Sequence, residues 1–184
     1  VTADMITIDG KADIAESTYN GKEHNVNISI DPANYTLTIK KDGVATSEIK
    51  KAGKYKITLT GQNDYSGTAE KNFKILSKAI SPVIKGTASK VYDGTTAATE
   101  LSISLNGVCG SDKVTATASY SYDNADVGTG KTVTATGITL SGEDAENYML
   151  SLASATTTGE IKKAKANITF KTGEGAYAFE NTYN

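Results

Sequence analysis

The chain has no tryptophan, no arginine, two prolines, one cysteine and one histidine among its 184 residues. Without arginine it lacks the planar fork that binds phosphates and base edges with paired hydrogen bonds, and a net charge of −2 offers no basic surface, so we expect no nucleic-acid partner. A single cysteine excludes an internal disulfide bond. No apolar run is long enough for a transmembrane helix, so we expect no membrane insertion by this segment.

Threonine, with 26 residues, and tyrosine, with 10, are abundant instead, and both suit a half-buried pleated surface. Apolar and polar side chains alternate with period two over 35–40, 55–60 and 114–122, which predicts strands with one buried face. Weaker patterns predict further strands at 5–8, 24–30, 70–76, 80–85, 96–105, 131–140, 147–152, 156–162 and 166–170.

Glycine and asparagine or aspartate punctuate these runs. Asp42-Gly43 between two strand patterns predicts a tight hairpin. Within 131–140 the alternation changes phase at Gly137, which predicts a bulge or bend. No segment has a sustained helical period, although 142–147 could form a single helical turn.

A tyrosine-centred motif recurs along the chain. Tyr19-Asn20-Gly21 matches Tyr92-Asp93-Gly94 at an offset of 73 residues, and Thr182-Tyr183-Asn184 copies Thr18-Tyr19-Asn20. In each turn glycine would permit a positive φ, asparagine or aspartate would bind its own backbone, and tyrosine would anchor the turn on the core. Recurrence in every repeat favours an architectural role for the motif over ligand binding.

The repeat also predicts the domains. Gly128 lies 75 residues after Gly53 in a similar context, so the offset drifts only slowly. We expect one β domain over 1–78, a second over 79–163, and the opening strand of a third repeat over 164–184. That strand would lack partners of its own and would be disordered or paired with a neighbouring sheet edge.

The fold that these patterns favour is all-β, with two tandem antiparallel Ig-like β-sandwich domains. The alternative, β-grasp-like units, would need a real helix in each repeat. Tyr148 follows Asp144-Ala145 just before a predicted strand and resembles the tyrosine corner of Ig-like sandwiches, in which the phenol binds back to the chain. Tyr55 could do the same in the first repeat, and an ordinary inward tyrosine is the other interpretation.

The residues offer little catalytic chemistry, and we expect the chain not to be an enzyme. A pair formed by Cys109 and His24 would have to join two repeats and lacks an orienting third group. The carboxylates of Glu143, Asp144 and Glu146 lack an apolar setting and are best explained as a solvated turn.

Metal and sugar binding are the remaining chemical hypotheses. Asp123 and Asp126 place oxygen ligands at close spacing in one loop and are the calcium candidates, although the loop departs from the EF-hand pattern; no other cofactor is expected. The tyrosines could stack on sugars, with Tyr65, Tyr177 and Tyr183 expected to be the most exposed, but most tyrosines fit core positions better.

The second repeat resembles the YDG domain family of bacterial cell-surface proteins. The resemblance is carried by three segments in order, Lys90-Val91-Tyr92-Asp93-Gly94-Thr95-Thr96-Ala97, Val127-Gly128-Thr129-Gly130-Lys131-Thr132-Val133 and Leu140 to Tyr148. The first repeat is similar to MBG-type or bacterial Ig-like repeats through Tyr19-Asn20-Gly21, Ala52-Gly53-Lys54-Tyr55 and 61–67.

The resemblance implies a tandem repeat of a large adhesin-like protein, extracellular, on the bacterial surface or secreted, with no known catalytic residues. We therefore expect a non-enzymatic stalk or spacer whose partners are the neighbouring repeats of the same chain. The alternative is an extracellular module that binds carbohydrate or a host surface protein through exposed loops.

Overall fold

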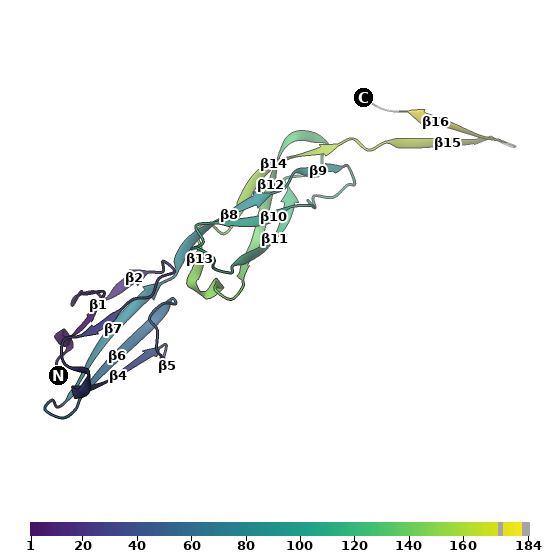
Figure 1. The fold of residues 1–184 in the computed structure, drawn as a ribbon. Helices are drawn as coiled ribbons and strands as arrows, with labels where there is room; N and C mark the ends of the chain where they lie inside the picture. Colours follow the sequence, from purple (N-terminus) through teal and green to yellow (C-terminus); the bar gives the residue numbers. More distant parts are fainter. Residues whose placement is uncertain (173–174, 182–184) are drawn as a thin grey trace. The chain divides into compact units, whose positions relative to one another are not determined.

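A computed structural model describes residues 1–172 and 175–181 (Figure 1). The expected all-β class is confirmed, since the only helical elements there are three single 3₁₀ turns, Ala3–Met5, Pro32–Asn34 and Ala145–Asn147. The last of these lies in the predicted turn at 142–147. The strands are β1 Ile6–Ile8, β2 Glu16–Thr18, β3 Val26–Ile28, β4 Tyr35–Lys41, β5 Val44–Thr46, β6 Gly53–Gly61, β7 Thr68–Leu76, β8 Lys78–Lys85, β9 Ala88–Val91, β10 Ser102–Asn106, β11 Thr115–Tyr122, β12 Gly128–Ser141, β13 Tyr148–Leu150, β14 Ala155–Lys162, β15 Ala166–Thr172 and β16 Gly175–Asn181.

The chain forms two compact units, each built from separate stretches of sequence. Unit 1 comprises Val1–Ser81, Leu105–Ala116 and Leu140–Ser151. Unit 2 comprises Pro82–Ser104, Thr117–Thr139 and the described residues from Leu152 onward. Strands β8, β10, β11 and β12 contribute residues to both units. The domain bounds expected from the sequence, 1–78 and 79–163, follow the repeat instead and stay a prediction.

Unit 1 is organised around a five-stranded sheet in the order β2-β7-β6-β4-β5. The alternation predicted at 55–60 is confirmed, because Tyr55, Ile57 and Leu59 are buried while Lys54 and Lys56 face solvent. The hairpin at Asp42-Gly43 is also confirmed, with Lys41 opposite Val44 and φ values of 48° and 88° at the two turn residues.

The core of unit 1 combines side chains of the five-stranded sheet with side chains of two smaller strand pairs, β1–β3 and β8–β13. Ile6 and Ile8 of the β1–β3 pair pack with Phe73 and Ile75 of β7. Ile80 and Tyr148, at the parallel β8–β13 pair, belong to the same buried cluster. Residues far apart in sequence therefore share one core, which positions the site described below.

Unit 2 contains a four-stranded sheet in the order β11-β12-β14-β9 and a smaller core. The core consists of Ala88, Ala98, Tyr122, Val133 and Ile161. The expected phase change in β12 is confirmed: Val133 and Ala135 are buried before Gly137, Ile138 is buried after it, and Gly137 has φ +62°.

The two sheets repeat one topology, with β2, β7, β6 and β4 corresponding to β9, β14, β12 and β11. In both, the first strand runs parallel to the last, β2 beside β7 and β9 beside β14, and β8 is parallel to β13. The sheets are thus mixed, whereas we expected purely antiparallel pairing. Period-two alternation reports which face of a strand is buried and carries no information about strand direction.

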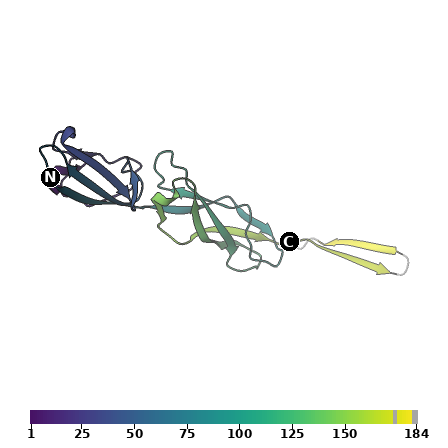
Figure 2. The same cartoon turned by 90° about the horizontal axis from the view of Figure 1, so that it is seen from below.

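The tail also differs from expectation. We expected one lone strand, but β15 and β16 pair with each other as an antiparallel hairpin, with Phe170 opposite Tyr177 in the register (Figure 2). The aromatic residues Tyr177 and Phe179 favour a second strand that the sequence reading did not assign. The expected motif copy at 182–184 lies outside the described residues.

Candidate functional site

The Tyr-Asn-Gly and Tyr-Asp-Gly motifs form the same turn. In the first, the Lys22 amide donates to Asn20 Oδ1 at 2.8 Å; in the second, the Thr95 amide donates to Asp93 Oδ1 at 2.9 Å. The glycines have φ values of +77° and +76°, a conformation that favours glycine. Each motif is therefore a side-chain-capped turn with a glycine in the left-handed region.

Each turn begins at the same place in its sheet. The Tyr19 amide donates to the Leu76 carbonyl at 2.9 Å, and the Tyr92 amide donates to the Lys162 carbonyl at 2.8 Å. The tyrosine thus extends the parallel pairing between the first and last strands by one bond. The prediction that the motif tyrosine anchors its turn on the core holds for Tyr19, which is buried, and is wrong for Tyr92, which is exposed.

The second turn also holds a half-buried ammonium group. Lys90 Nζ donates to Asp93 Oδ1 at 2.7 Å, to the Thr95 carbonyl and hydroxyl at 2.7 and 2.9 Å, and to the Ala97 carbonyl at 3.0 Å. It also lies 5.8 Å from the ring centre of Tyr122. The hydrogen bond from Lys90, followed by those from the Thr95 amide and hydroxyl, lowers the pKa of Asp93 to about 2. Asp93 thus carries the charge that pairs with Lys90.

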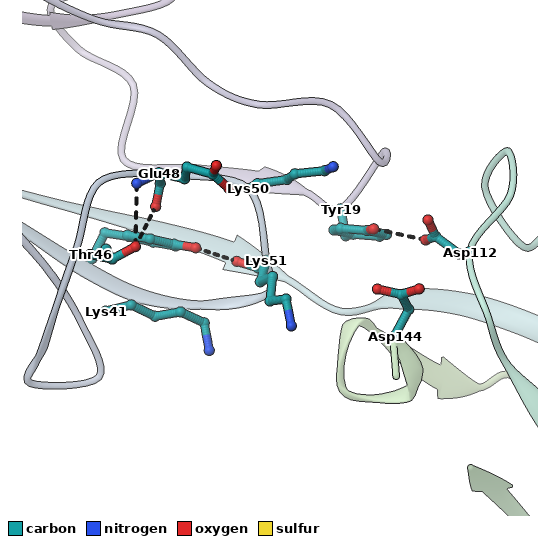
Figure 3. Close-up of a pocket in the computed structure, with 9 residues that line it drawn as sticks. Tyr19, Lys41, Thr46, Glu48, Lys50, Lys51, Asp112 and Asp144 are labelled. Carbon is teal, nitrogen blue, oxygen red and sulfur yellow. Dashed lines mark hydrogen bonds between the residues drawn. The ribbon is translucent and has the colours of Figure 1, made fainter. Parts of the chain in front are cut away.

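In unit 1 the motif tyrosine is part of a three-residue cluster. Tyr19 and Tyr148 both donate to Asp112 Oδ2, at 2.7 and 2.5 Å, and their rings meet edge to face with centroids 5.4 Å apart. The Cys109 amide donates to the Tyr148 oxygen at 2.9 Å. The side chains of Tyr19 and Asp112 point toward each other in Figure 3, with Asp144 nearby. Sequence reasoning selected the two tyrosines but missed Asp112.

The cluster is suited to holding structure rather than to catalysis. Burial raises the pKa of the Tyr19 phenol, and the neighbouring Asp112 raises it further. The pKa of Tyr148 is raised for the same two reasons, burial first. Both phenols therefore stay protonated near neutral pH and act as hydrogen-bond donors, not as nucleophiles or bases.

Tyr148 does not form a local tyrosine corner. Its oxygen binds Cys109 and Asp112, which lie more than thirty residues upstream. The corner-like bond belongs to Tyr55, whose hydroxyl donates to the carbonyl of Lys51 four residues earlier at 2.7 Å. Tyr55 therefore makes the bond back to the chain that we expected of a tyrosine corner in the first repeat.

The acidic turn before β13 is tied to its surroundings. Asp144 Oδ2 accepts from the Lys113 amide at 2.9 Å, and Glu146 lies 3.1 Å from Lys51 Nζ. Asn147 is fully buried, and its Oδ1 accepts from the Ala52 amide at 2.9 Å. Its Nδ2 has no acceptor among the described residues. The carboxylates of Asp144 and Glu146 thus have a backbone amide and a lysine as their partners, which indicates a structural role for this turn.

A pocket of about 250 Å³ opens beside Tyr19 in unit 1 (Figure 3). It is smaller and more polar than the apolar clefts that usually bind small ligands. Three of its lining side chains are cationic and three anionic, so no strong field of one sign develops. Its lining residues are Tyr19, Lys41, Thr46, Glu48, Lys50, Lys51, Tyr55, Asp112 and Asp144.

The calcium candidates lie in the loop between β11 and β12. Asp123 Oδ1 is 3.2 Å from Lys131 Nζ, and Asn124 Oδ1 also accepts from that ammonium. Lys131 is 9% exposed and lies on the inward phase of β12. The loop thus carries its own cation beside Asp123, and over the described residues no group of three acidic, histidine or cysteine side chains could hold a metal ion. Calcium binding at Asp123 and Asp126 stays a prediction.

His24 and Cys109 have different partners. His24 Nδ1 is 2.6 Å from Asp9 Oδ2, and its ring packs against Phe73. Cys109 Sγ accepts from Lys78 Nζ at 3.2 Å. Each side chain is accounted for by its own local contacts.

Among the tyrosines whose side chains the structure describes, the exposed one is Tyr92, and the exposure expected for Tyr65 is wrong. Tyr65 is half-buried, whereas Tyr92 is 46% exposed. The Tyr177 side chain and Tyr183 lie outside what the structure describes.

No described helix is long and apolar enough to cross a membrane.

Comparison with known proteins identifies one family. Residues 76–159 match the model of the YDG domain, which confirms the resemblance expected for the second repeat. The MBG-type resemblance of the first repeat stays a prediction. No curated protein matches the chain. Among solved structures, the chain is similar to the three N-terminal domains of the bacteriophage RB49 Highly Immunogenic Outer Capsid protein (Hoc), at 15% identity and a TM-score of 0.30, over 96% of this chain and 69% of that one.

Proposed function

We propose that the chain is a non-enzymatic structural repeat, a stalk or spacer, of a large extracellular protein of the bacterial surface. The observation that carries this proposal is the parallel pairing of the first and last strands of each large sheet, β2 with β7 and β9 with β14. The match of 76–159 to the YDG domain supports the surface context.

The parallel pairing has a mechanical consequence. A pull along the chain acts in opposite directions on the first and last strands of each large sheet. When those strands are parallel neighbours, their ladder of hydrogen bonds lies across the line of force and is loaded together in shear. Antiparallel neighbours would instead separate one bond at a time. The topology therefore suits a module that transmits tension.

The polar side chains of the site support the same function. The phenols of Tyr19 and Tyr148 donate hydrogen bonds to Asp112. The ammonium of Lys90 donates to Asp93 in the second turn. Groups that would perform acid, base or nucleophilic chemistry are thus engaged in internal hydrogen bonds. This supports the proposal that the chain is not an enzyme.

Force spectroscopy on the full chain tests the proposal. The Lys74 amide donates to the Ala15 carbonyl at 2.9 Å, beside β2, so Lys74→Pro removes one bond of the loaded ladder. We expect a high unfolding force for unit 1 that falls in Lys74→Pro. Ala45→Pro, in edge strand β5, is the matched control and should leave the force unchanged. A low force in the unmodified chain, insensitive to Lys74→Pro, would overturn the proposal.

A second candidate is an extracellular module that binds carbohydrate or a host surface protein. The observation that favours it is Tyr92, 46% exposed beside Val91, which is 57% exposed. A glycan array with mucins, with and without calcium, tests this function on the full chain. Saturable binding that Tyr92→Ala abolishes would favour recognition, and absence of binding would leave the stalk.

A further inference from the structure

Three exposed apolar residues lie at one end of the unit 2 sheet. Val91 is 57% exposed, Tyr92 46% and Val127 43%. Val91 pairs with Lys162, and Gly128, next to Val127, pairs with Ile161, so the three residues lie at the same end of the neighbouring strands β9, β14 and β12. We call Val91, Tyr92 and Val127 the open end.

Unit 1 has the corresponding residues in the same register. Thr18 pairs with Leu76 and Gly53 pairs with Ile75, as Val91 does with Lys162 and Gly128 with Ile161. Thr18, Tyr19 and Ala52 are therefore the counterparts of the open end, and we call them the covered end. Tyr19 is 3% exposed and Ala52 is 9% exposed.

Polar bonds and close packing cover the unit 1 end. Asp112 accepts from the Tyr19 hydroxyl at 2.7 Å, and Asn147 Oδ1 accepts from the Ala52 amide at 2.9 Å. A Cβ on Gly21 would lie 3.2 Å from the Cβ of Cys109. All three covering residues come from Leu105–Ala116 and Leu140–Ser151, segments of the YDG match.

We propose that the open end of unit 2 is a docking surface for a further YDG-type repeat, which covers it as the two segments cover unit 1. This inference rests on the proposed role as one repeat of an array. The occupant must offer a carboxylate to the Tyr92 hydroxyl, a buried amide oxygen to the Val127 amide and a small side chain against Gly94. A second copy of residues 79–163 offers all three through Asp112, Asn147 and Cys109.

The covered end and the open end differ in charge at one pair of corresponding positions. Lys51 pairs with Glu146 at 3.1 Å in unit 1, whereas Asp126 occupies the Lys51 position in unit 2. Lys162, at the position of Leu76, is well exposed and supplies a cation on the same sheet end. An acidic turn such as 143–146 of a docked copy therefore still meets a lysine.

Tyrosine nitration tests the proposal in the full chain carrying a second copy of residues 79–163 inserted after Lys163. The inserted copy carries Tyr92→Phe, so that only the original Tyr92 is measured by peptide mass spectrometry. With tetranitromethane as the reagent, we expect its nitration to slow by about tenfold or more, the factor that one unit of raised phenol pKa gives, because this reagent attacks the phenolate. Asp112→Ala in the inserted copy should restore the fast rate, and Asp64→Ala in unit 1 should not.

The unextended chain provides a test that does not depend on folding of the insert. Asp112→Ala there should accelerate nitration of Tyr19 only in part, because burial still raises the pKa of its phenol. Equal nitration of Tyr92 with and without a folded insert, judged by protection of the insert's Tyr122, would overturn the docking surface. A nitration rate of Tyr19 that Asp112→Ala leaves entirely unchanged would overturn it too. Either result would leave the force measurements, and hence the stalk, unaffected.

Discussion

Tyr19 and Tyr148 donate hydrogen bonds to the same oxygen, Oδ2 of Asp112, while their rings meet edge to face. One tyrosine comes from the repeated motif and the other from the YDG match. The shared acceptor couples them, because the charge on one carboxylate is stabilised by both phenols. Internal hydrogen bonds thus engage the hydroxyl groups of both tyrosines.

This sharing predicts non-additive losses. Tyr19→Phe and Tyr148→Phe should each destabilise unit 1 by about 1.5–3 kcal/mol, the usual range for a hydrogen bond to a charged group. The double variant should differ from the sum by about 0.5 kcal/mol or more, because both remove donors from one oxygen. Hydrogen exchange of β2 and β6 measures these losses. Strict additivity would contradict the shared acceptor, and Tyr35→Phe, whose ring is also in unit 1, serves as a control.

The two motif glycines offer a matched pair. Gly21→Ala and Gly94→Ala both place alanine at a φ near +76°, which costs about 1–2 kcal/mol. At Gly21 the new methyl would also lie 3.2 Å from Cys109 Cβ, whereas at Gly94 it meets nothing within 4 Å. We expect Gly21→Ala to cost about 1 kcal/mol more, measured by local hydrogen exchange. Equal costs would show that Cys109 yields freely, and Gly21→Ala with Cys109→Gly should remove the difference.

Acid should weaken the second turn through Asp93. Its pKa falls from the ordinary 3.8 to about 2, chiefly through the bond from Lys90 and further through the bonds from Thr95. A carboxyl with a lowered folded-state pKa stabilises the fold above pH 3.8, and this contribution is lost as pH falls toward 2. Hydrogen exchange in β9 should therefore accelerate across this window, and Asp93→Asn should flatten the dependence. The exposed Asp64→Asn should not, and an unchanged profile in Asp93→Asn would exclude the turn as the source.

Asn147 should matter through a single backbone bond. Asn147→Ala removes the acceptor of the buried Ala52 amide, which should cost about 1–3 kcal/mol. The measurement is exchange of the Ala52 amide by NMR. Asn72→Ala, on the exposed face of β7, should stay within about 0.5 kcal/mol of the unmodified chain. Slow exchange at Ala52 in Asn147→Ala would mean that another group satisfies this amide.

Several features of the fold could be predicted from short-range pattern. Alternation at 55–60 identified the buried face of β6, and Asp42-Gly43 identified a hairpin. Gly137 marked the phase change, because a left-handed residue in a strand resets which side chains face inward. The short strands β2 and β9 escaped notice because three or four residues carry too little periodicity.

Long-range features were beyond such patterns. The offset between repeats is 75 at Gly53 and Gly128 but 86 at Ile75 and Ile161, so the second repeat inserts residues between its last two long strands. Those inserted residues include Asn147 and Tyr148. The role of Asp112 could not be predicted, because a single aspartate in a polar loop has no sequence pattern that links it to distant tyrosines.

The sequence by itself determined the all-β class, the repeat, the motif turns and the YDG resemblance, because each depends on residues that are close neighbours along the chain. Only the tertiary structure decided which strands run parallel, that Lys131 is buried, and that Tyr19 and Tyr148 share Asp112. These outcomes depend on the free energy of bringing distant segments together, where burial and shared hydrogen bonds must exceed the entropy of closing long loops.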